Sequence, residues 1–143
     1  MKCGKCSKSS LKRATIRHEI EVAGERFVGT IEGHQCGSCG DAQLPLDALV
    51  KLEHAVAHRL AEKGPVNGST MRYMRKSIPI SAANLAQLLR VAPETVSRWE
   101  TGERAVDRAA WLVVRELLLN PGEQSRIAEL RDEPSKNPVP IAV

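Results

Sequence analysis

Aromatic side chains and long apolar runs are both scarce in this chain of 143 residues. The aromatic residues are two Trp, one Tyr and one Phe, or 3% of the sequence. A core must therefore be built mainly from aliphatic side chains, which supply most of the 42% hydrophobic content. No apolar stretch approaches the ~20 residues that a transmembrane helix needs. The start, MKCGKCSKSS, lacks the apolar segment of a secretion signal. We therefore expect a cytoplasmic protein with no membrane partner.

The four cysteines form two Cys-x-x-Cys pairs, CGKC near the amino terminus and CGSC further along. In a reducing cytoplasm such pairs are more often metal ligands or redox groups than disulfides. Two such turns supply the four soft ligands of a tetrahedral zinc site. We therefore predict a structural zinc ion bound by Cys3, Cys6, Cys36 and Cys39. Four thiolates leave no open position for a catalytic water, so we expect that the protein is not an enzyme.

Two other chemistries use the same cysteine spacing. A rubredoxin-like iron site is usually surrounded by aromatic side chains, whereas this segment offers only Phe27. A disulfide or a thioredoxin-like redox pair would be expected within a βαβ pattern, which neither motif has. An electron-transfer or thiol redox protein remains an alternative of a different class. His54 and His58 have a metal-compatible spacing on one predicted helix, but we interpret them as part of a solvated face.

The residues between and after the cysteines predict a hairpin followed by a helix. TIRHEIEV (15–22) alternates apolar and polar residues, AGE (23–25) is a turn, and RFVGTIE (26–32) returns as a second strand. Both cysteine pairs then lie at the open end of this hairpin. From Leu46 to Lys63 the apolar spacing becomes helical, between Pro45 and Gly64. We predict a zinc-binding β-hairpin plus helix domain over residues 1–63.

The second half of the sequence predicts only helices. GPVNGST (64–70) has no periodicity and is interpreted as an interdomain linker. Four short helical patterns follow, at about 71–77, 81–89, 93–101 and 107–119, within a domain of residues 71–122. The tail, 123–143, is expected to be mostly disordered because it is rich in proline and poor in large apolar side chains. The predicted fold class is α+β.

The stretch SAANLAQLLRVAPETVSRWETG (81–102) is the most informative part of this half. Ser81 is suited to cap one helix, and Pro93 to begin the next. Val96 and Trp99, three residues apart, are expected to face the core, while Gly102 ends the helix. This leaves a polar outer face made of Glu94, Thr95, Ser97 and Arg98.

This stretch resembles the helix-turn-helix of Xre/Cro-type repressors. The match includes Leu85, Ala86, Val91, Val96, Ser97, Arg98, Trp99, Glu100 and Gly102. Ala82 stands where these proteins often have glutamine, and Arg90 replaces the usual turn glycine, which requires an altered turn. The resemblance implies an all-α Xre-type domain whose second helix enters the major groove of double-stranded DNA. It also implies a structural ion pair between Arg75 and Glu100.

Side-chain chemistry assigns roles on such a helix. Arg98 suits guanine, Glu94 suits cytosine, and Thr95 and Ser97 suit a thymine methyl group or a phosphate. By the same resemblance, Arg108 is expected to contact a phosphate. The predicted DNA-binding residues are Ser81, Glu94, Thr95, Ser97, Arg98 and Arg108.

Two further features concern partners. The segment DRAAWLVVRELLL (107–119) has more apolar residues than one helix face buries, which favours a homodimer through the C-terminal domain on a palindromic operator. The order of cysteine pairs, linker and helix-turn-helix resembles the MqsA/YgiT family of antitoxins over all but the last twenty residues. In that family the zinc domain binds a toxin, typically an RNA-cutting enzyme, and the C-terminal domain represses its own promoter.

The resemblance therefore implies an antitoxin of a type II toxin-antitoxin system. Such a protein neutralises a ribonuclease-type toxin and acts as a DNA-binding transcriptional autorepressor. The alternative is a stand-alone Xre-family transcriptional regulator with a structural zinc domain.

Overall fold

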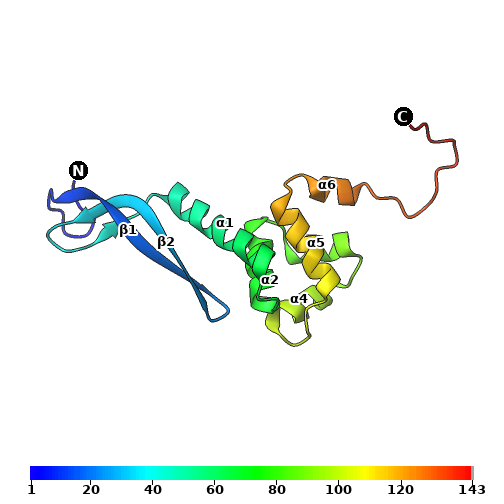
Figure 1. The fold of residues 1–143 in the computed structure, drawn as a ribbon, viewed down its shortest axis with the longest axis horizontal. Helices are drawn as coiled ribbons and strands as arrows, with labels where there is room; N and C mark the ends of the chain where they lie inside the picture. Colours follow the sequence, from blue (N-terminus) through cyan, green and yellow to red (C-terminus); the bar gives the residue numbers. More distant parts are fainter. Residues whose placement is uncertain (143) are drawn as a thin grey trace.

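The computed structural model describes residues 1–142 and has an α+β fold (Figure 1). A three-stranded antiparallel sheet, in the order β1-β2-β3, lies at one end of the elongated chain, and a group of helices lies at the other. Helix α1 runs between the two ends. Over residues 1–142, every helix is too short or too polar to cross a bilayer. The elements are β1 (Leu11–Val22), β2 (Glu25–Cys36), β3 (Ala42–Gln43), α1 (Leu46–Lys63), α2 (Gly68–Ser77), α3 (Ala82–Leu89), α4 (Pro93–Thr101), α5 (Arg108–Leu119) and α6 (Glu123–Ala128).

Strands β1 and β2 form one long hairpin. Their register runs from Val22 opposite Glu25 at the turn to Leu11 opposite Cys36 at the open end. Ala23 and Gly24 both have positive φ, as a two-residue hairpin turn requires. Both strands are longer than the predicted 15–22 and 26–32. The hydrogen bonds between β1 and β2 join main-chain groups only. The strands therefore continue into segments where apolar and polar side chains do not alternate clearly.

One face of the hairpin is covered by α1, and β3 lies beside β2 at the edge of the sheet. A side-chain carbon added at Gly29 would collide with Leu52 of α1, and one added at Gly33 would collide with the main-chain oxygen of Gln43. Gly29 therefore lets α1 pack closely on the sheet, and Gly33 lets β3 lie close beside β2. His18, opposite Gly29, is half-buried on this face.

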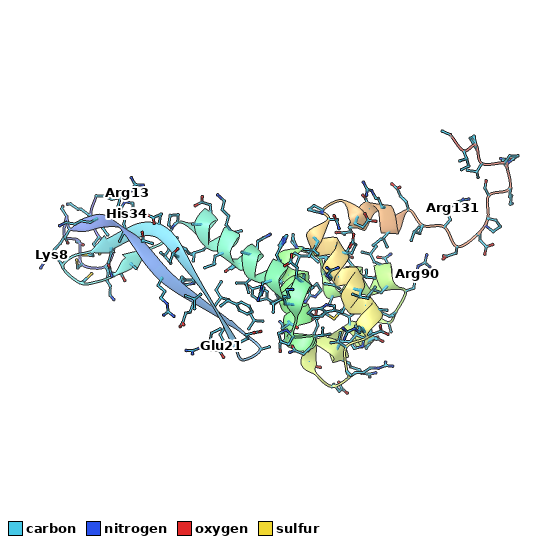
Figure 2. All side chains as sticks on the ribbon, viewed as in Figure 1. Lys8, Arg13, Glu21, His34, Arg90 and Arg131 are labelled. Carbon is cyan, nitrogen blue, oxygen red and sulfur yellow. The ribbon has the colours of Figure 1, made fainter. Side chains whose placement is uncertain are left out.

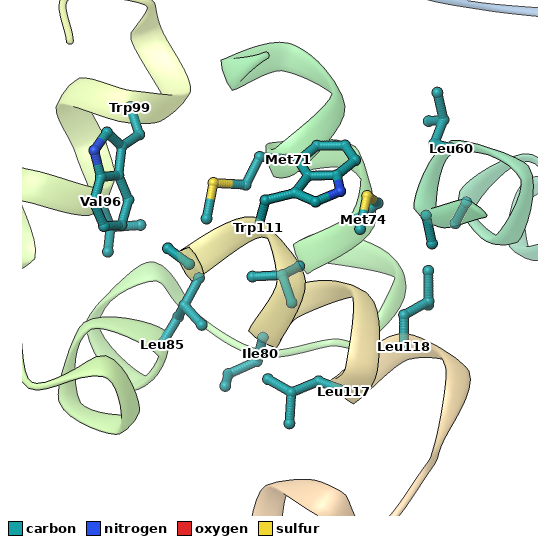
Figure 3. Packing of buried hydrophobic residues seen from close by; sticks show 14 of the residues in the cluster. Leu60, Met71, Met74, Ile80, Leu85, Val96, Trp99, Trp111, Leu117 and Leu118 are labelled. Carbon is teal, nitrogen blue, oxygen red and sulfur yellow. The ribbon is translucent and has the colours of Figure 1, made fainter. Parts of the chain in front are cut away.

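The main hydrophobic core lies among the helices, and α1 contributes to it (Figure 3). The second half of α1 buries Val56, Ala57, Leu60 and Ala61 in the same cluster as the side chains of α2 to α5. In Figure 3, Trp111 of α5 lies near Met71 and Met74 of α2. Val22, at the closed end of the hairpin, also belongs to this cluster.

The packing corrects the predicted domain boundary. Residues 64–70 do not separate two cores, because α1 packs on the sheet with Leu52 and on the helical core with Leu60. The apolar residues of this helix follow one continuous helical spacing in the sequence. That spacing does not reveal that the first half of the helix contacts the sheet and the second half contacts the helical core.

Part of the predicted linker is helical. Helix α2 begins at Gly68 rather than at 71. The Asn67 side chain accepts a hydrogen bond from the Thr70 N–H at 3.0 Å, and the Thr70 hydroxyl accepts one from the Asn67 N–H at 3.2 Å. This capping box satisfies two N–H groups at the start of the helix. Thr70 is fully buried, and Gly68 lies against the main-chain oxygen of Trp99. These residues are thus part of the packed structure.

The tail also differs from the prediction. Residues 123–128 form α6, whose Ile127 packs against the core. Residues 129–142 contain neither helix nor strand. The Asp132 carboxylate lies 2.7 Å from the Arg90 guanidinium, in an exposed ion pair. Composition alone did not reveal that Ile127 has an apolar surface to contact.

Leu60→Ala tests whether α1 belongs to the helical core. Leu60 is 0% exposed, so we expect the free energy of unfolding to fall by about 2–5 kcal/mol. Urea unfolding followed by the fluorescence of Trp99 and Trp111 would measure it. Leu46→Ala, on the same helix but 76% exposed, should change stability by less than about 0.5 kcal/mol. An unchanged tryptophan transition in Leu60→Ala would mean that α1 is not part of this core.

Candidate metal centre and nucleic-acid interface

The four cysteines come together at the open end of the hairpin, as the sequence predicted. Their sulfur atoms all lie within 4.8 Å of one another. Cys6 Sγ lies 3.6 Å from Cys36 Sγ, and Cys3 Sγ lies 3.7 Å from Cys39 Sγ. A tetrahedral ion with metal–sulfur bonds of ~2.3 Å places its ligands ~3.8 Å apart, whereas a disulfide bond is ~2.0 Å long. The residues present therefore fit one tetrahedral metal ion.

The two Cys-x-x-Cys segments form nearly equivalent turns. The Ser7 N–H donates to the Cys3 carbonyl and the Gly40 N–H to the Cys36 carbonyl, each at 2.9 Å. The Lys5 and Ser38 N–H groups point at the sulfurs of Cys3 and Cys36, respectively, each at 3.4 Å. The first turn precedes β1 and the second follows β2. The hairpin register, with Leu11 opposite Cys36, therefore brings them together.

The surroundings of the thiols shift the pKa values of Cys36 and Cys39 in opposite directions. The Ser10 hydroxyl, followed by the backbone N–H groups of Cys39 and Ser38, lowers the pKa of the Cys36 thiol to about 6. For Cys39 the backbone N–H of Asp41 lowers the pKa, but desolvation of the sulfur and the neighbouring cysteines outweigh it and raise the pKa to about 12. Four adjacent thiolates repel one another, so a cation that replaces their protons would stabilise the set.

The histidines stand apart from this cluster. Within residues 1–142, the four cysteines are the one group of three or more metal-binding side chains that lie together. His34 lies on β2 opposite Arg13, near the metal end of the hairpin in Figure 2, and is not one of the four ligands. His54 and His58 are exposed on α1, in agreement with the solvated face predicted for them.

At the other end of the chain, α3 and α4 are joined by a short turn. Arg90 has φ 57° and ψ 41°, so it adopts the left-handed conformation that glycine usually supplies. The sequence predicted an altered turn here, because Arg90 replaces the glycine usual in Xre/Cro-type repressors. The Val91 N–H donates to the Ala86 carbonyl at 3.0 Å. Ser81 caps α3, where its hydroxyl accepts a hydrogen bond from the Asn84 N–H at 3.0 Å.

Helix α4 has one buried and one exposed side. Val96 and Trp99 are buried, as predicted. Arg98 is 54% exposed and lies 3.9 Å from the Glu103 carboxylate. The other residues predicted to bind DNA are distributed as follows: Glu94 and Ser97 are exposed and Thr95 is half-buried on α4, Arg108 is exposed at the start of α5, and Ser81 is exposed at the start of α3.

A largely buried ion pair holds α4 in place. The Arg75 guanidinium of α2 donates two hydrogen bonds to the Glu100 carboxylate, and a third to the Ile80 carbonyl at 2.8 Å. The two side chains are 11% and 8% exposed. The pair implied by the resemblance is therefore present, and it fixes the end of α4 against α2 and the α2–α3 connection.

Comparison of the chain with protein-family models and with curated proteins found no match. The cysteine cluster and the α3–α4 unit are therefore interpreted from their own geometry. They lie at opposite ends of the elongated chain (Figure 1).

Two features of the structure, one at the start of α2 and one at the cysteine cluster, escaped the sequence analysis. The Asn-x-x-Thr spacing at 67–70 is a capping-box pattern and was available to find. The role of Ser10 could not be predicted from the sequence, because this residue lies outside both Cys-x-x-Cys motifs. Its hydroxyl lies 3.1 Å from Cys36 Sγ only because the hairpin folds back.

Cys36→Ser tests the metal centre. We expect the metal content to fall from one ion per chain to none, because a tetrahedral site loses a soft ligand. A structural zinc ion contributes an apparent ~10–16 kcal/mol, so residues 1–43 should lose hydrogen-exchange protection. Residues 71–119, which lie in the helical core that α1 completes, should keep most of it.

His34→Ala is the matched control and should retain one ion per chain. Metal retained at full occupancy in Cys36→Ser, with unchanged protection of the hairpin, would rule out the four-cysteine centre.

Proposed function

We propose that the protein is an antitoxin of a type II toxin-antitoxin system. Its hairpin end would hold a structural zinc ion and bind a ribonuclease-type toxin. Its helical end would bind operator DNA as a helix-turn-helix dimer and repress transcription. The observation that carries this proposal is the polar face of α4, held rigidly against the core at the opposite end of the chain from the cysteine cluster.

The four-thiol geometry supports a metal that is structural rather than catalytic. Cys3, Cys6, Cys36 and Cys39 would fill all positions of a tetrahedral ion, so no position remains for water or substrate. The ion would supply a cross-link between the two turns of a small sheet. Zinc and iron are separated by the absorption spectrum of the purified protein, because iron–thiolate centres are coloured and zinc is not.

The arrangement of α4 supports DNA binding. A helix that reads bases must be fixed in position while its polar side stays free. Val96 and Trp99 fix α4 in the core, and Glu100 ties its end to α2. Arg98 remains 54% exposed. Its planar guanidinium is suited to the two acceptors of guanine in the major groove.

The surface of α5 is compatible with a homodimer. Ala110, Trp111, Val114, Leu117 and Leu118 are buried within the chain. Leu112 is 53% exposed, and Val113 and Leu119 are half-buried. Most of the apolar surplus expected from the sequence therefore packs internally. A dimer would cover the smaller remainder, which begins at Leu112.

Arg98→Ala tests DNA binding. We expect a loss of about 1–3 kcal/mol in binding to the DNA upstream of the coding sequence, with relaxed specificity at one base pair. Fluorescence anisotropy with single-base operator variants would measure it. Arg126→Ala, an exposed arginine on α6, should leave affinity and specificity unchanged. Equal effects of the two substitutions would argue against α4 as the reading helix.

Co-expression with the adjacent open reading frame tests the antitoxin role. We expect the neighbouring product to arrest growth alone and the wild-type chain to restore growth and co-purify with it. Cys36→Ser should fail to restore growth, because the hairpin loses its cross-link, whereas Arg98→Ala should still restore it. If the neighbour is harmless but operator binding is intact, the stand-alone regulator is the correct alternative.

A further inference from the structure

A side-chain hydroxyl outside the cysteine motifs lies against the proposed metal centre. Ser10 is half-buried in the segment between Cys6 and the start of β1. Its Oγ lies 3.1 Å from Cys36 Sγ and 2.9 Å from Ser38 Oγ. Its carbonyl accepts a hydrogen bond from the Gly37 N–H at 3.0 Å. Ser10 thus contacts the second cysteine turn through both its side chain and its main chain.

We propose that Ser10 is a positioning residue of the metal centre, whose hydroxyl donates a hydrogen bond to the Cys36 thiolate and sets how tightly the centre holds its ion. This inference rests on the metal centre proposed above. It concerns the strength of that centre rather than its existence.

The chemistry of the three groups determines the direction of these hydrogen bonds. A metal-bound thiolate has no proton and can only accept. A serine hydroxyl has one proton to donate and can also accept. The Ser10 proton must therefore point at Cys36 Sγ, and the Ser38 hydroxyl must donate to Ser10 Oγ. A chain from Ser38 through Ser10 to Cys36 results, and each bond in such a chain strengthens the next.

This hydrogen bond makes the centre asymmetric. The two cysteine turns are otherwise similar, since Cys3 and Cys36 each face an N–H group two residues further along, at 3.4 Å. Cys36 has in addition the Ser10 hydroxyl. Among the hydrogen bonds of residues 1–142, this is the one that reaches a cysteine sulfur from the side chain of a residue other than cysteine. Cys36 is also almost fully buried. It is therefore the most firmly held sulfur.

The expected consequence concerns metal affinity. A hydrogen bond to a bound thiolate spreads its charge and orients the sulfur lone pairs, and removal of such a partner typically weakens metal binding by about 10–100-fold. Loss of the hydroxyl also makes Cys36 a more electron-rich donor. A cobalt ion in the site should report this as a sulfur-to-cobalt charge-transfer band at longer wavelength.

The test uses the full chain as wild type, Ser10→Ala, Ser10→Thr and Ser9→Ala. Zinc affinity is measured by competition with a chromophoric chelator, and the spectrum is recorded with Co²⁺. We expect Ser10→Ala to bind zinc about 10–100-fold more weakly and to shift the charge-transfer band. Ser10→Thr keeps a hydroxyl and should restore both properties. Ser9→Ala, a change at the neighbouring exposed serine, should match the wild type.

Three results would overturn the inference. One is an unchanged zinc affinity in Ser10→Ala. The second is a weaker affinity with an unchanged cobalt spectrum, which would mean that Ser10 acts only by holding the backbone. The third is failure of Ser10→Thr to restore either property. If the wild-type chain itself binds neither zinc nor cobalt, the metal centre proposed above fails instead.

Discussion

The close approach of four thiols at the open end of the hairpin is the constraint on which the N-terminal half depends. A two-stranded hairpin is marginally stable in water, and here it has twelve residues in each strand. Its closed end is anchored by Val22 in the helical core. Its open end is held by turns whose sulfurs lie 3.6 to 3.7 Å apart. These sulfurs repel one another once they are ionised, so protons or a cation that neutralises them stabilises this end of the hairpin.

Helix α1 joins the hairpin to the helical core. Its first half covers the sheet at Gly29 with Leu52, and its second half enters the helical core with Val56 and Leu60. The Arg115 side chain of α5 donates a hydrogen bond to the Ala61 carbonyl at 3.0 Å, which adds a polar tie to the same interface. A change at the hairpin can therefore affect the helical core through direct packing, without a flexible connection between them.

The two proposed activities place different demands on the fold. A toxin-binding hairpin needs an exposed sheet, and one face of the hairpin carries exposed side chains such as Arg13 and Glu21, both labelled in Figure 2. A base-reading helix needs a rigid support, and α4 has the buried Trp99 and the Arg75–Glu100 pair. A charged pair this far from solvent is costly to break at one partner, by about 3–5 kcal/mol. It thus favours one position of α4 over others.

Spacing along the sequence was sufficient to predict the four cysteines as one cluster, the hairpin and the exposed side of α4. The unusual turn at Arg90 was predicted from the resemblance to Xre/Cro-type repressors. The hairpin and α4 depend on a periodicity that one element carries by itself. The cysteines depend on a motif that occurs twice, on either side of the hairpin. Tertiary structure decided the rest. Leu52 and Leu60 have the same helical spacing but different partners, and Thr70 is buried because Asn67 caps α2 where a linker was expected. Ser10 reaches Cys36 across 26 residues of sequence. No local pattern records such a contact, because it exists only when the strand register places the two segments side by side.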